Sequence, residues 1–207
     1  MINNISPLWV LENGEIEKGE VGLLVGAKSS GKSKCITNIG IEKILNGKSI
    51  LHVSLEDLPD KISDYYRLKV NELVKFTGKR EDLERIENKR IILSYLSKNF
   101  NPEKLDNSIR NLKENGYSFD VLLLDGLETE KISVLKEIKK IATNYQLEVW
   151  ISFSSENYLK IKEELKKVCN CVIRLISHKE DVYVTLEEKD VRLNLDPTTL
   201  FVKSLKS

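Results

Sequence analysis

The stretch with the clearest chemistry is Gly26 to Ser33, which reads Gly-Ala-Lys-Ser-Ser-Gly-Lys-Ser. The spacing G-x-x-x-x-G-K-S is that of a phosphate-binding P-loop, in which backbone N–H groups converge on phosphate oxygens. Lys32 supplies positive charge to the β- and γ-phosphates, and the hydroxyl of Ser33 is a ligand for Mg²⁺. The alternative is a Gly/Ser-rich turn that carries a lysine by chance.

The residues on both sides of this motif favour phosphate binding over a simple turn. The run Val21 to Val25 is short and apolar, and the run Lys34 to Leu45 can form a helix, so strand, loop and helix follow in the required order. The N-terminus of that helix adds a positive dipole end to the same site. We therefore predict contacts with the phosphates from Gly26, Ala27, Lys28, Ser29, Ser30, Gly31, Lys32, Ser33 and Lys34.

Asp125 is the second candidate, because it directly follows the apolar run Val121 to Leu124. An aspartate at the end of such a strand belongs to the Mg²⁺ site in P-loop NTPases, where it binds the metal through water or orders the P-loop hydroxyl. An ordinary turn or helix-cap aspartate is the alternative. With a P-loop upstream, we predict that Ser33 and Asp125 form the metal site.

Two neighbouring carboxylates, Glu56 and Asp57, follow the predicted strand Ser49 to Leu55. A carboxylate at this place can orient and deprotonate the water that attacks the γ-phosphate. Both residues can equally cap the next helix, where negative charge suits the helix dipole. Position alone does not choose between them. His52 lies inside the same strand and is interpreted as a core histidine with satisfied hydrogen bonds and no role in the chemistry.

Apolar strands and amphipathic helices alternate along most of the chain, which predicts an α/β fold with a mostly parallel sheet and helices on both faces. Ligands of such sheets bind at the carboxyl ends of the strands. We expect strands near 49–55, 91–96, 120–125, 147–153 and 171–176, and a helical region at 58–88 that breaks at 77–78. The chain then changes character, and 182–186 and 200–202 predict a C-terminal antiparallel hairpin joined through Asp196-Pro197.

Composition excludes some classes of protein. The 207 residues include 33 Lys and Arg and 32 Asp and Glu, so a net charge of +1 gives no overall sign of a nucleic-acid binder. The odd number of cysteines, three, and the absence of a signal-peptide pattern predict reduced thiols and a cytoplasmic location. No apolar run is long enough to span a membrane, so we expect no membrane association.

Taken together, these motifs resemble the RecA-type ATPases, and most closely the ATPase domain of DnaB-type replicative helicases and the related KaiC-like proteins. The matching segments are Gly19 to Ser33, Val53 to Glu56, Asp120 to Asp125 and Ile151 to Ser155. The resemblance implies a RecA-like P-loop NTPase domain over 19–207, preceded by a lead segment at 1–18. It also implies that the protein binds and hydrolyses ATP with Mg²⁺.

The resemblance also implies roles for single residues. Glu56 takes the place of the catalytic glutamate and Asp125 that of the metal-site aspartate. The sensor of the γ-phosphate falls at Ser154 or Ser155, of which Ser154 is the better match. A Lys-x-Arg pair that completes the neighbouring subunit's site finds its nearest counterpart in Lys189 and Arg192, which are one residue further apart.

This last pair leads to two readings. If Lys189 and Arg192 act in a neighbour's site, the protein is a homo-oligomer such as a hexamer; otherwise they are surface charges on a hairpin.

The first functional hypothesis is a helicase-like ATPase of DNA replication or recombination that binds single-stranded DNA. The second is a KaiC-like regulatory or assembly ATPase with protein partners, which the short segment Gly126 to Lys131 favours. A small-molecule kinase is the third, and the position of Glu56 argues against it.

Overall fold

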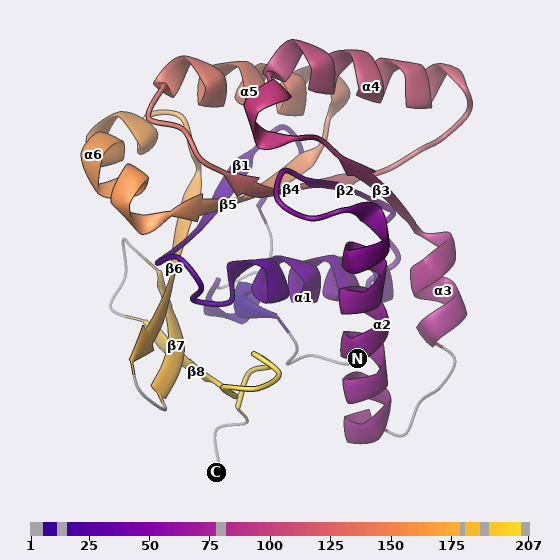
Figure 1. Cartoon of the computed structure of the whole chain (residues 1–207), viewed down its shortest axis with the longest axis vertical. Helices are drawn as coiled ribbons and strands as arrows, with labels where there is room; N and C mark the ends of the chain where they lie inside the picture. The colour runs from indigo at the N-terminus through magenta and orange to yellow at the C-terminus, as the bar shows by residue number, and fades with distance from the viewer. Residues whose placement is uncertain (1–5, 12–15, 78–81, 179–180, 187–190, 204–207) are drawn as a thin grey trace.

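The protein is described by a computed structural model that places residues 6–11, 16–77, 82–178, 181–186 and 191–203. Within these ranges one eight-stranded sheet forms the centre, with the strand order β3-β2-β4-β5-β1-β6-β7-β8 (Figure 1). The strands are β1 Val21–Gly26, β2 Ile50–Ser54, β3 Arg90–Ser94, β4 Val121–Leu127, β5 Glu148–Ser154, β6 Cys171–His178, β7 Asp181–Leu186 and β8 Arg192–Leu195. Strands β1 to β6 pair in parallel, and β7 and β8 continue the sheet in antiparallel fashion.

Helices cover both faces of the sheet, as Figure 1 shows. They are α1 Lys32–Leu45, α2 Pro59–Thr77, α3 Asp82–Asn88, α4 Pro102–Glu114, α5 Ile132–Tyr145 and α6 Ser155–Leu165, with 3₁₀ turns at Pro7–Val10 and Ser97–Asn99. Helices α1 to α3 pack on one face and α4 to α6 on the other, and each face has its own buried apolar cluster. Since side chains alternate along a strand, Leu123 joins the first cluster while Leu122 and Leu124 join the second.

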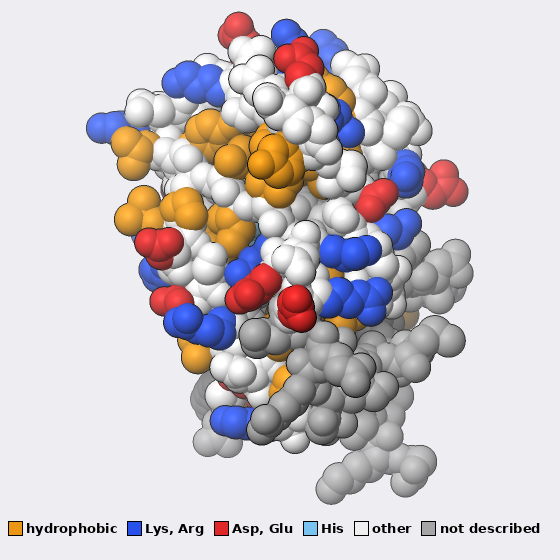
Figure 2. All heavy atoms as spheres, turned by 90° about the vertical axis from the view of Figure 1, so that its right-hand side faces the viewer, with side chains coloured by type: hydrophobic (Ala, Val, Ile, Leu, Met, Phe, Trp, Pro, Cys, Tyr) orange, Lys and Arg blue, Asp and Glu red, His pale blue; other side chains and the backbone are white. Residues whose placement is uncertain are grey.

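The central strands are apolar because both of their faces are covered. Every residue of β1, β2 and β4 is buried, which is typical of parallel strands between two layers of helices. The edge strand β3 is different, since each of its five residues is partly exposed. Figure 2 shows the side of the molecule on which β3 lies, where apolar side chains gather among charged ones. Leu96, just after β3, is 63% exposed. The predicted α/β fold class is confirmed.

The register of the sheet brings the carboxyl ends of four strands together. Gly26 at the end of β1 lies opposite Ser154 of β5, and Ser54 at the end of β2 lies opposite Asp125 of β4. Parallel sheets bind ligands at this edge. The polar residues singled out in the sequence therefore come from strands that end side by side.

Some predicted boundaries need correction. The predicted break in the helical region 58–88 is confirmed, because α2 ends at Thr77 and α3 begins at Asp82. The strand expected at 91–96 is β3, which ends earlier, at Ser94. The predicted C-terminal antiparallel hairpin is confirmed, but β7 pairs with β8, so the assignment of a strand to 200–202 is wrong. Val202 makes only an isolated bridge to Leu195. The side chain of Asp196 accepts backbone N–H groups that follow it, which turns the chain before a further strand can form.

The lead segment contributes to the core. The 3₁₀ turn Pro7–Val10 begins after Ser6, whose hydroxyl accepts the N–H of Leu8, and Leu8 is fully buried in the cluster on the α1 face. The lead segment therefore packs against the core of the sheet's α1 face. Among the described helices, none combines the length and the apolar character that crossing a membrane requires.

Candidate active site

The P-loop geometry follows from its glycines. Strand β1 ends at Gly26, where a Cβ atom would lie 2.6 Å from the hydroxyl oxygen of Ser30, so a side chain does not fit. Gly31 has φ +95° and directly precedes α1, a conformation that glycine adopts without cost. Ser29 also has a positive φ of 61°. These backbone conformations curl the loop into a concave shape of the kind that binds anions.

The lysine of the loop folds back across it. The Lys32 ammonium donates a hydrogen bond to the carbonyl oxygen of Ala27, with an N···O distance of 2.8 Å. Burial lowers the pKa of Lys32, while the carboxylates of Glu56, Asp125 and Glu128 act in the opposite direction. The ammonium therefore lies in a pocket to which these three carboxylates contribute negative charge.

Asp125 is buried, and one of its two carboxylate oxygens is hydrogen-bonded to a neighbouring strand. It is 1% exposed, and its Oδ1 accepts the hydroxyl of Ser152 at 2.5 Å. The same hydroxyl oxygen accepts the backbone N–H of Gly126 at 2.8 Å, which fixes the end of β4 against β5. Oδ2 of Asp125 has no hydrogen-bond partner among the described residues. A buried carboxylate oxygen without a partner requires a cation or water, so this geometry fits a metal site.

Glu56 lies directly over Gly126. A Cβ atom on Gly126, whose φ is +82°, would lie 2.6 Å from Cγ of Glu56 and 3.0 Å from its Cδ. The hydroxyl of Ser54 accepts the N–H groups of Glu56 and Asp57 at 3.3 and 2.9 Å, which sets the direction of the chain after β2. Loss of hydration raises the pKa of Glu56, and the neighbouring Asp125 raises it further while Lys32 lowers it.

Asp57 points elsewhere. Its carboxylate forms an ion pair with Lys61, one turn later on α2, at 2.6 Å. This is the helix-start role that the sequence offered as an alternative for both carboxylates. The geometry therefore favours Glu56 as the carboxylate of the pocket.

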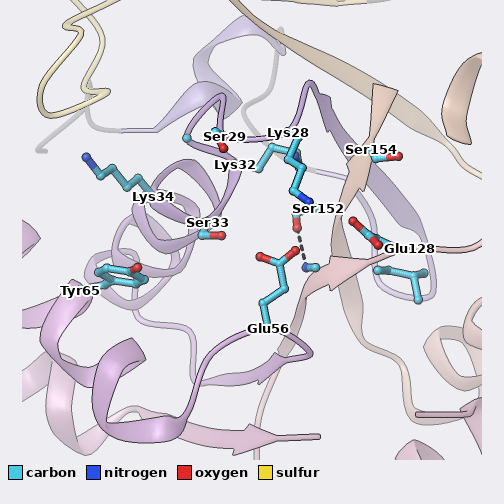
Figure 3. A pocket seen from close by; sticks show the side chains of 13 residues that line it. Lys28, Ser29, Lys32, Ser33, Lys34, Glu56, Tyr65, Glu128, Ser152 and Ser154 are labelled. Carbon is cyan, nitrogen blue, oxygen red and sulfur yellow. Dashed lines mark hydrogen bonds between the residues drawn. The ribbon is translucent and has the colours of Figure 1, made fainter. Parts of the chain in front are cut away.

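These residues surround a pocket of about 280 Å³ at the carboxyl ends of the strands (Figure 3). Its walls come from the P-loop, the ends of β2, β4 and β5, and helix α2. The lining residues are Lys28, Ser29, Gly31, Lys32, Ser33, Lys34, Glu56, Tyr65, Gly126, Leu127, Glu128, Ser152 and Ser154. Asp125 lies behind Ser152, to which it is hydrogen-bonded.

Five lining residues were not predicted as part of the site, and two of them, Gly126 and Leu127, are the last residues of β4. Glu128 directly follows β4, and Ser152 precedes the end of β5, so both stand where parallel strands present their ligands. Tyr65 comes from α2 and lines the pocket from outside the strand ends. The position after a strand could have pointed to Glu128, whereas only the packing of α2 against α1 identifies Tyr65.

The predicted sensor position is in the pocket. Ser154 lines it and also caps the start of α6, because its hydroxyl accepts the N–H of Asn157 at 3.2 Å. Ser155 is the first residue of α6. Of the two serines, the better-matched one is therefore at the site.

Of the pair predicted to complete a neighbouring subunit's site, Arg192 does not line the pocket of its own chain. Lys189 lies outside the described residues. Arg192 is exposed on β8, where its guanidinium stacks 3.7 Å from the centre of the Tyr183 ring and its Nε donates to Asn194.

His52 differs from the satisfied core histidine that was expected. It is fully buried, its Nδ1 lies 2.9 Å from the hydroxyl of Tyr66, and its Nε2 has no hydrogen-bond partner among the described residues. Burial lowers its pKa from 6.5 to about 4, with Asp125 opposing and Arg90 adding to the shift. The imidazole is therefore neutral at neutral pH.

Comparison with known proteins identifies the architecture. No family model and no curated protein sequence matches this chain. Among solved structures 442 chains are similar, so the arrangement is common. One is the ATPase domain of G40P, with a TM-score of 0.64 and 13% sequence identity over 88% of this chain and 83% of that one. The fold is RecA-like. At this identity the similarity concerns the fold, and it confirms the predicted RecA-like class.

Proposed function

We propose that this protein binds ATP together with Mg²⁺ and hydrolyses it. The observation that carries the proposal is the pocket itself, in which a complete P-loop faces Glu56 while buried Asp125 keeps one carboxylate oxygen without a protein partner. The RecA-like fold, shared with the ATPase domain of G40P, supports the same conclusion.

The loop and its lysine would bind the phosphates. The backbone N–H groups of the curl and of the first turn of α1 point toward an anion in this type of loop. The ammonium of Lys32 now satisfies the carbonyl of Ala27, and a phosphate oxygen would replace that carbonyl as its acceptor. The exchange converts a contact within the loop into a charge-assisted contact with the nucleotide.

The metal would be held by few protein groups. Ser33 and Asp125 are the residues that fit it, directly or through water, which is common for Mg²⁺ at nucleotide phosphates. Among the described residues there is no cluster of three or more acidic, His or Cys side chains that would form a dedicated metal cage. Bound Mg²⁺ supplies charge neutralisation on the phosphate oxygens. Ser152 keeps Asp125 in one orientation for this task.

Glu56 would act as the base that accepts a proton from the attacking water. Its raised pKa makes it a better proton acceptor than an ordinary glutamate, and Gly126 leaves the space in which its side chain rests. Ser154 is proposed to contact the γ-phosphate, because it lines the pocket from the end of β5.

We further propose that the protein works as a homo-oligomer. The exposed Arg192 on β8 lies outside its own pocket, and it is the candidate that would complete a neighbour's site together with Lys189. An arginine supplied in this way stabilises charge in the transition state of phosphoryl transfer. The cytoplasmic location expected from the cysteines belongs to the same proposal.

Two cellular roles follow from the resemblance. One is a helicase-like ATPase of DNA replication or recombination, acting on single-stranded DNA. The other is a KaiC-like ATPase that acts on protein partners. The connection from β4 to α5 comprises only residues 128–131, and this short segment favours the second role.

One experiment tests the proposal and separates these roles. ATP hydrolysis by the purified protein is measured with and without single-stranded DNA, and Lys32→Ala is compared with Lys75→Ala, an exposed lysine at the end of α2. We expect Lys32→Ala to lower turnover by about a hundredfold or more, since it removes the charge placed against the phosphates. Lys75→Ala should retain wild-type turnover.

The outcomes have distinct meanings. Unchanged hydrolysis by Lys32→Ala would refute the P-loop assignment. Stimulation of the wild type by DNA would support the helicase-like role, and turnover that is independent of DNA would support the role with protein partners.

A further inference from the structure

The chain after β8 forms a self-closed turn over residues 196–201. Oδ1 of Asp196 accepts the N–H of Thr198 at 3.0 Å and the N–H and hydroxyl of Thr199 at 2.8 and 3.0 Å. The N–H of Leu200 donates to the Asp196 carbonyl, and the N–H of Asp196 donates to the Phe201 carbonyl. The hydrogen bonds from Thr199 and Thr198 to its carboxylate lower the pKa of Asp196. The turn therefore has a defined shape of its own.

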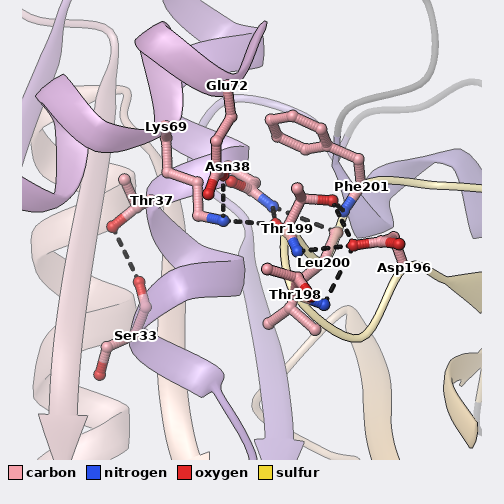
Figure 4. A network of polar contacts seen from close by, with 10 residues as sticks. All are labelled: Ser33, Thr37, Asn38, Lys69, Glu72, Asp196, Thr198, Thr199, Leu200 and Phe201. Atoms are coloured by element: carbon pink, nitrogen blue, oxygen red, sulfur yellow. Dashed lines mark hydrogen bonds and ion pairs between the residues drawn. The ribbon is translucent and has the colours of Figure 1, made fainter. Parts of the chain in front are cut away.

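Two helices hold this turn, as Figure 4 shows. Asn38 of α1 is buried, and its Nδ2 lies 3.2 Å from the carbonyl oxygens of both Thr199 and Leu200. Lys69 of α2 is 4% exposed, and its ammonium donates to the carbonyl of Thr199 at 2.6 Å and pairs with Glu72 at 2.8 Å. An ammonium at such a position is unfavourable unless it is paired and hydrogen-bonded. The turn is thus fixed to the helix that begins at the P-loop.

Leu200 connects the fixed turn to the P-loop through a contact with Gly31. A Cβ atom on Gly31 would lie 2.8 Å from Cδ1 of Leu200, so the leucine methyl group occupies the space that a side chain of Gly31 would take. Leu200 is 3% exposed and has φ +56°, a left-handed conformation that costs a leucine about 1 kcal/mol or more. The strain is maintained by the contacts around it, which the turn and the two helices provide.

We propose that Leu200 is a positioning residue for the P-loop. Held in place through Asn38 and Lys69, it packs against Gly31 and keeps the end of the loop in the conformation that accepts phosphate. A loop that is already ordered loses less entropy when it binds its ligand. This inference rests on the proposed nucleotide-binding function.

A purely structural role for Leu200 predicts a different result. In that case its truncation lowers stability as any core truncation does and leaves the folded fraction with normal affinity. Leu195→Ala is the matched control, because Leu195 is fully buried in the same apolar cluster and the substitution is identical. The control removes the same atoms from β8 at the residue before the turn begins.

The experiment measures the dissociation constants of ATP and ADP with Mg²⁺ by titration calorimetry for the wild type, Leu200→Ala, Leu200→Gly, Leu200→Met and Leu195→Ala. Leu200→Gly removes the side chain and also the left-handed strain. We therefore expect this variant to remain folded even if Leu200→Ala does not. We expect both truncations to weaken binding about five- to tenfold, because the loop must then be ordered on binding. Leu200→Met should bind with nearly the wild-type dissociation constant, and the dissociation constant of Leu195→Ala should stay within about twofold of the wild type.

A second readout does not depend on nucleotide. Hydrogen–deuterium exchange of the backbone amides of residues 26–33 should be faster in Leu200→Ala and Leu200→Gly than in the wild type and Leu195→Ala. Unchanged exchange and unchanged affinity in folded Leu200 variants, or equal loss of affinity in Leu195→Ala, would overturn the inference. If the wild type binds no nucleotide, the proposed function is refuted. The exchange measurement needs no nucleotide, so it separates that result from a failure of the inference about Leu200.

Discussion

Gly126→Ala is the substitution that most directly examines the placement of Glu56. Gly126 has φ +82°, and a Cβ atom there would lie 2.6 Å from Cγ, 3.0 Å from Cδ and 3.3 Å from Oε1 of Glu56. Carbon atoms in contact lie about 3.5–4.0 Å apart, so the glutamate side chain would have to move by roughly 1 Å. Since a side chain gives way more easily than the backbone of β4, we expect Glu56 to be the group that moves.

The size of the effect follows from two separate terms. An alanine in the left-handed conformation costs about 1–2 kcal/mol of folding stability. Misplacing a catalytic group by about 1 Å lowers turnover by about a hundredfold. The substitution leaves the P-loop untouched. We expect the dissociation constant for ATP to change by less than about threefold, because the loop supplies most of the phosphate contacts in the proposed complex.

The assay compares kcat, ATP affinity and thermal unfolding of Gly126→Ala with those of Gly116→Ala. Gly116 has φ +84°, and no atom lies within 4 Å of a Cβ placed there, so the control introduces the same backbone strain without touching Glu56. Both variants should lose similar stability, and only Gly126→Ala should lose turnover. On the background of Glu56→Gln, Gly126→Ala should have little further effect on turnover, because both changes act on one group.

Two results would refute this reasoning. Full turnover in a folded Gly126→Ala variant would mean that Glu56 does not work from the position over Gly126. An additional large loss on the Glu56→Gln background would mean that Gly126 acts through another group.

Two further predictions concern single side chains. Glu56→Gln should keep ATP bound while turnover falls by orders of magnitude, and Asp57→Asn, which removes only the ion pair with Lys61, should turn over normally; the reverse pattern would assign the base to Asp57. In urea unfolding, the free energy of unfolding should fall less between pH 6.5 and pH 4 in His52→Gln than in the wild type. The folded pKa of His52, about 4, lies below its ordinary value of 6.5, so its contribution is complete above pH 6.5 and is lost, by up to about 3 kcal/mol, as the pH falls toward 4. Parallel profiles of wild type and variant would contradict that pKa.

Much of this molecule can be predicted from local sequence signals. The P-loop is readable because its glycines, lysine and serine have a fixed spacing, and β4 is readable because a strand buried on both faces is a continuous apolar run. Asp125 and Glu56 are recognisable as site candidates because each comes directly after a short apolar run. In these cases one short segment contains the whole signal.

Other features depend on contacts between distant segments. Ser152 is one hydroxyl inside an apolar strand, and only the pairing of β5 with β4 shows that it holds Asp125. The wrong assignment of a strand to 200–202 has a similar origin, because this segment has the apolar composition of a strand. Its residues instead pack on α1 after the turn at Asp196, where Asn38 binds them. Such pairings over long sequence separations leave no local pattern.

The place of β1 within the sheet has a consequence for synthesis of the chain. Gly22 of β1 pairs with Trp150 of β5 on one side and with Cys171 of β6 on the other, so the P-loop strand has no sheet neighbour from its own half of the chain. On a ribosome, the first segment of the pocket to emerge must wait for the last parallel strand before both its edges are covered. Contacts of such long range close slowly. Nucleotide could therefore assist only the final stage of folding, when β6 has left the exit tunnel and the loop can be held in place.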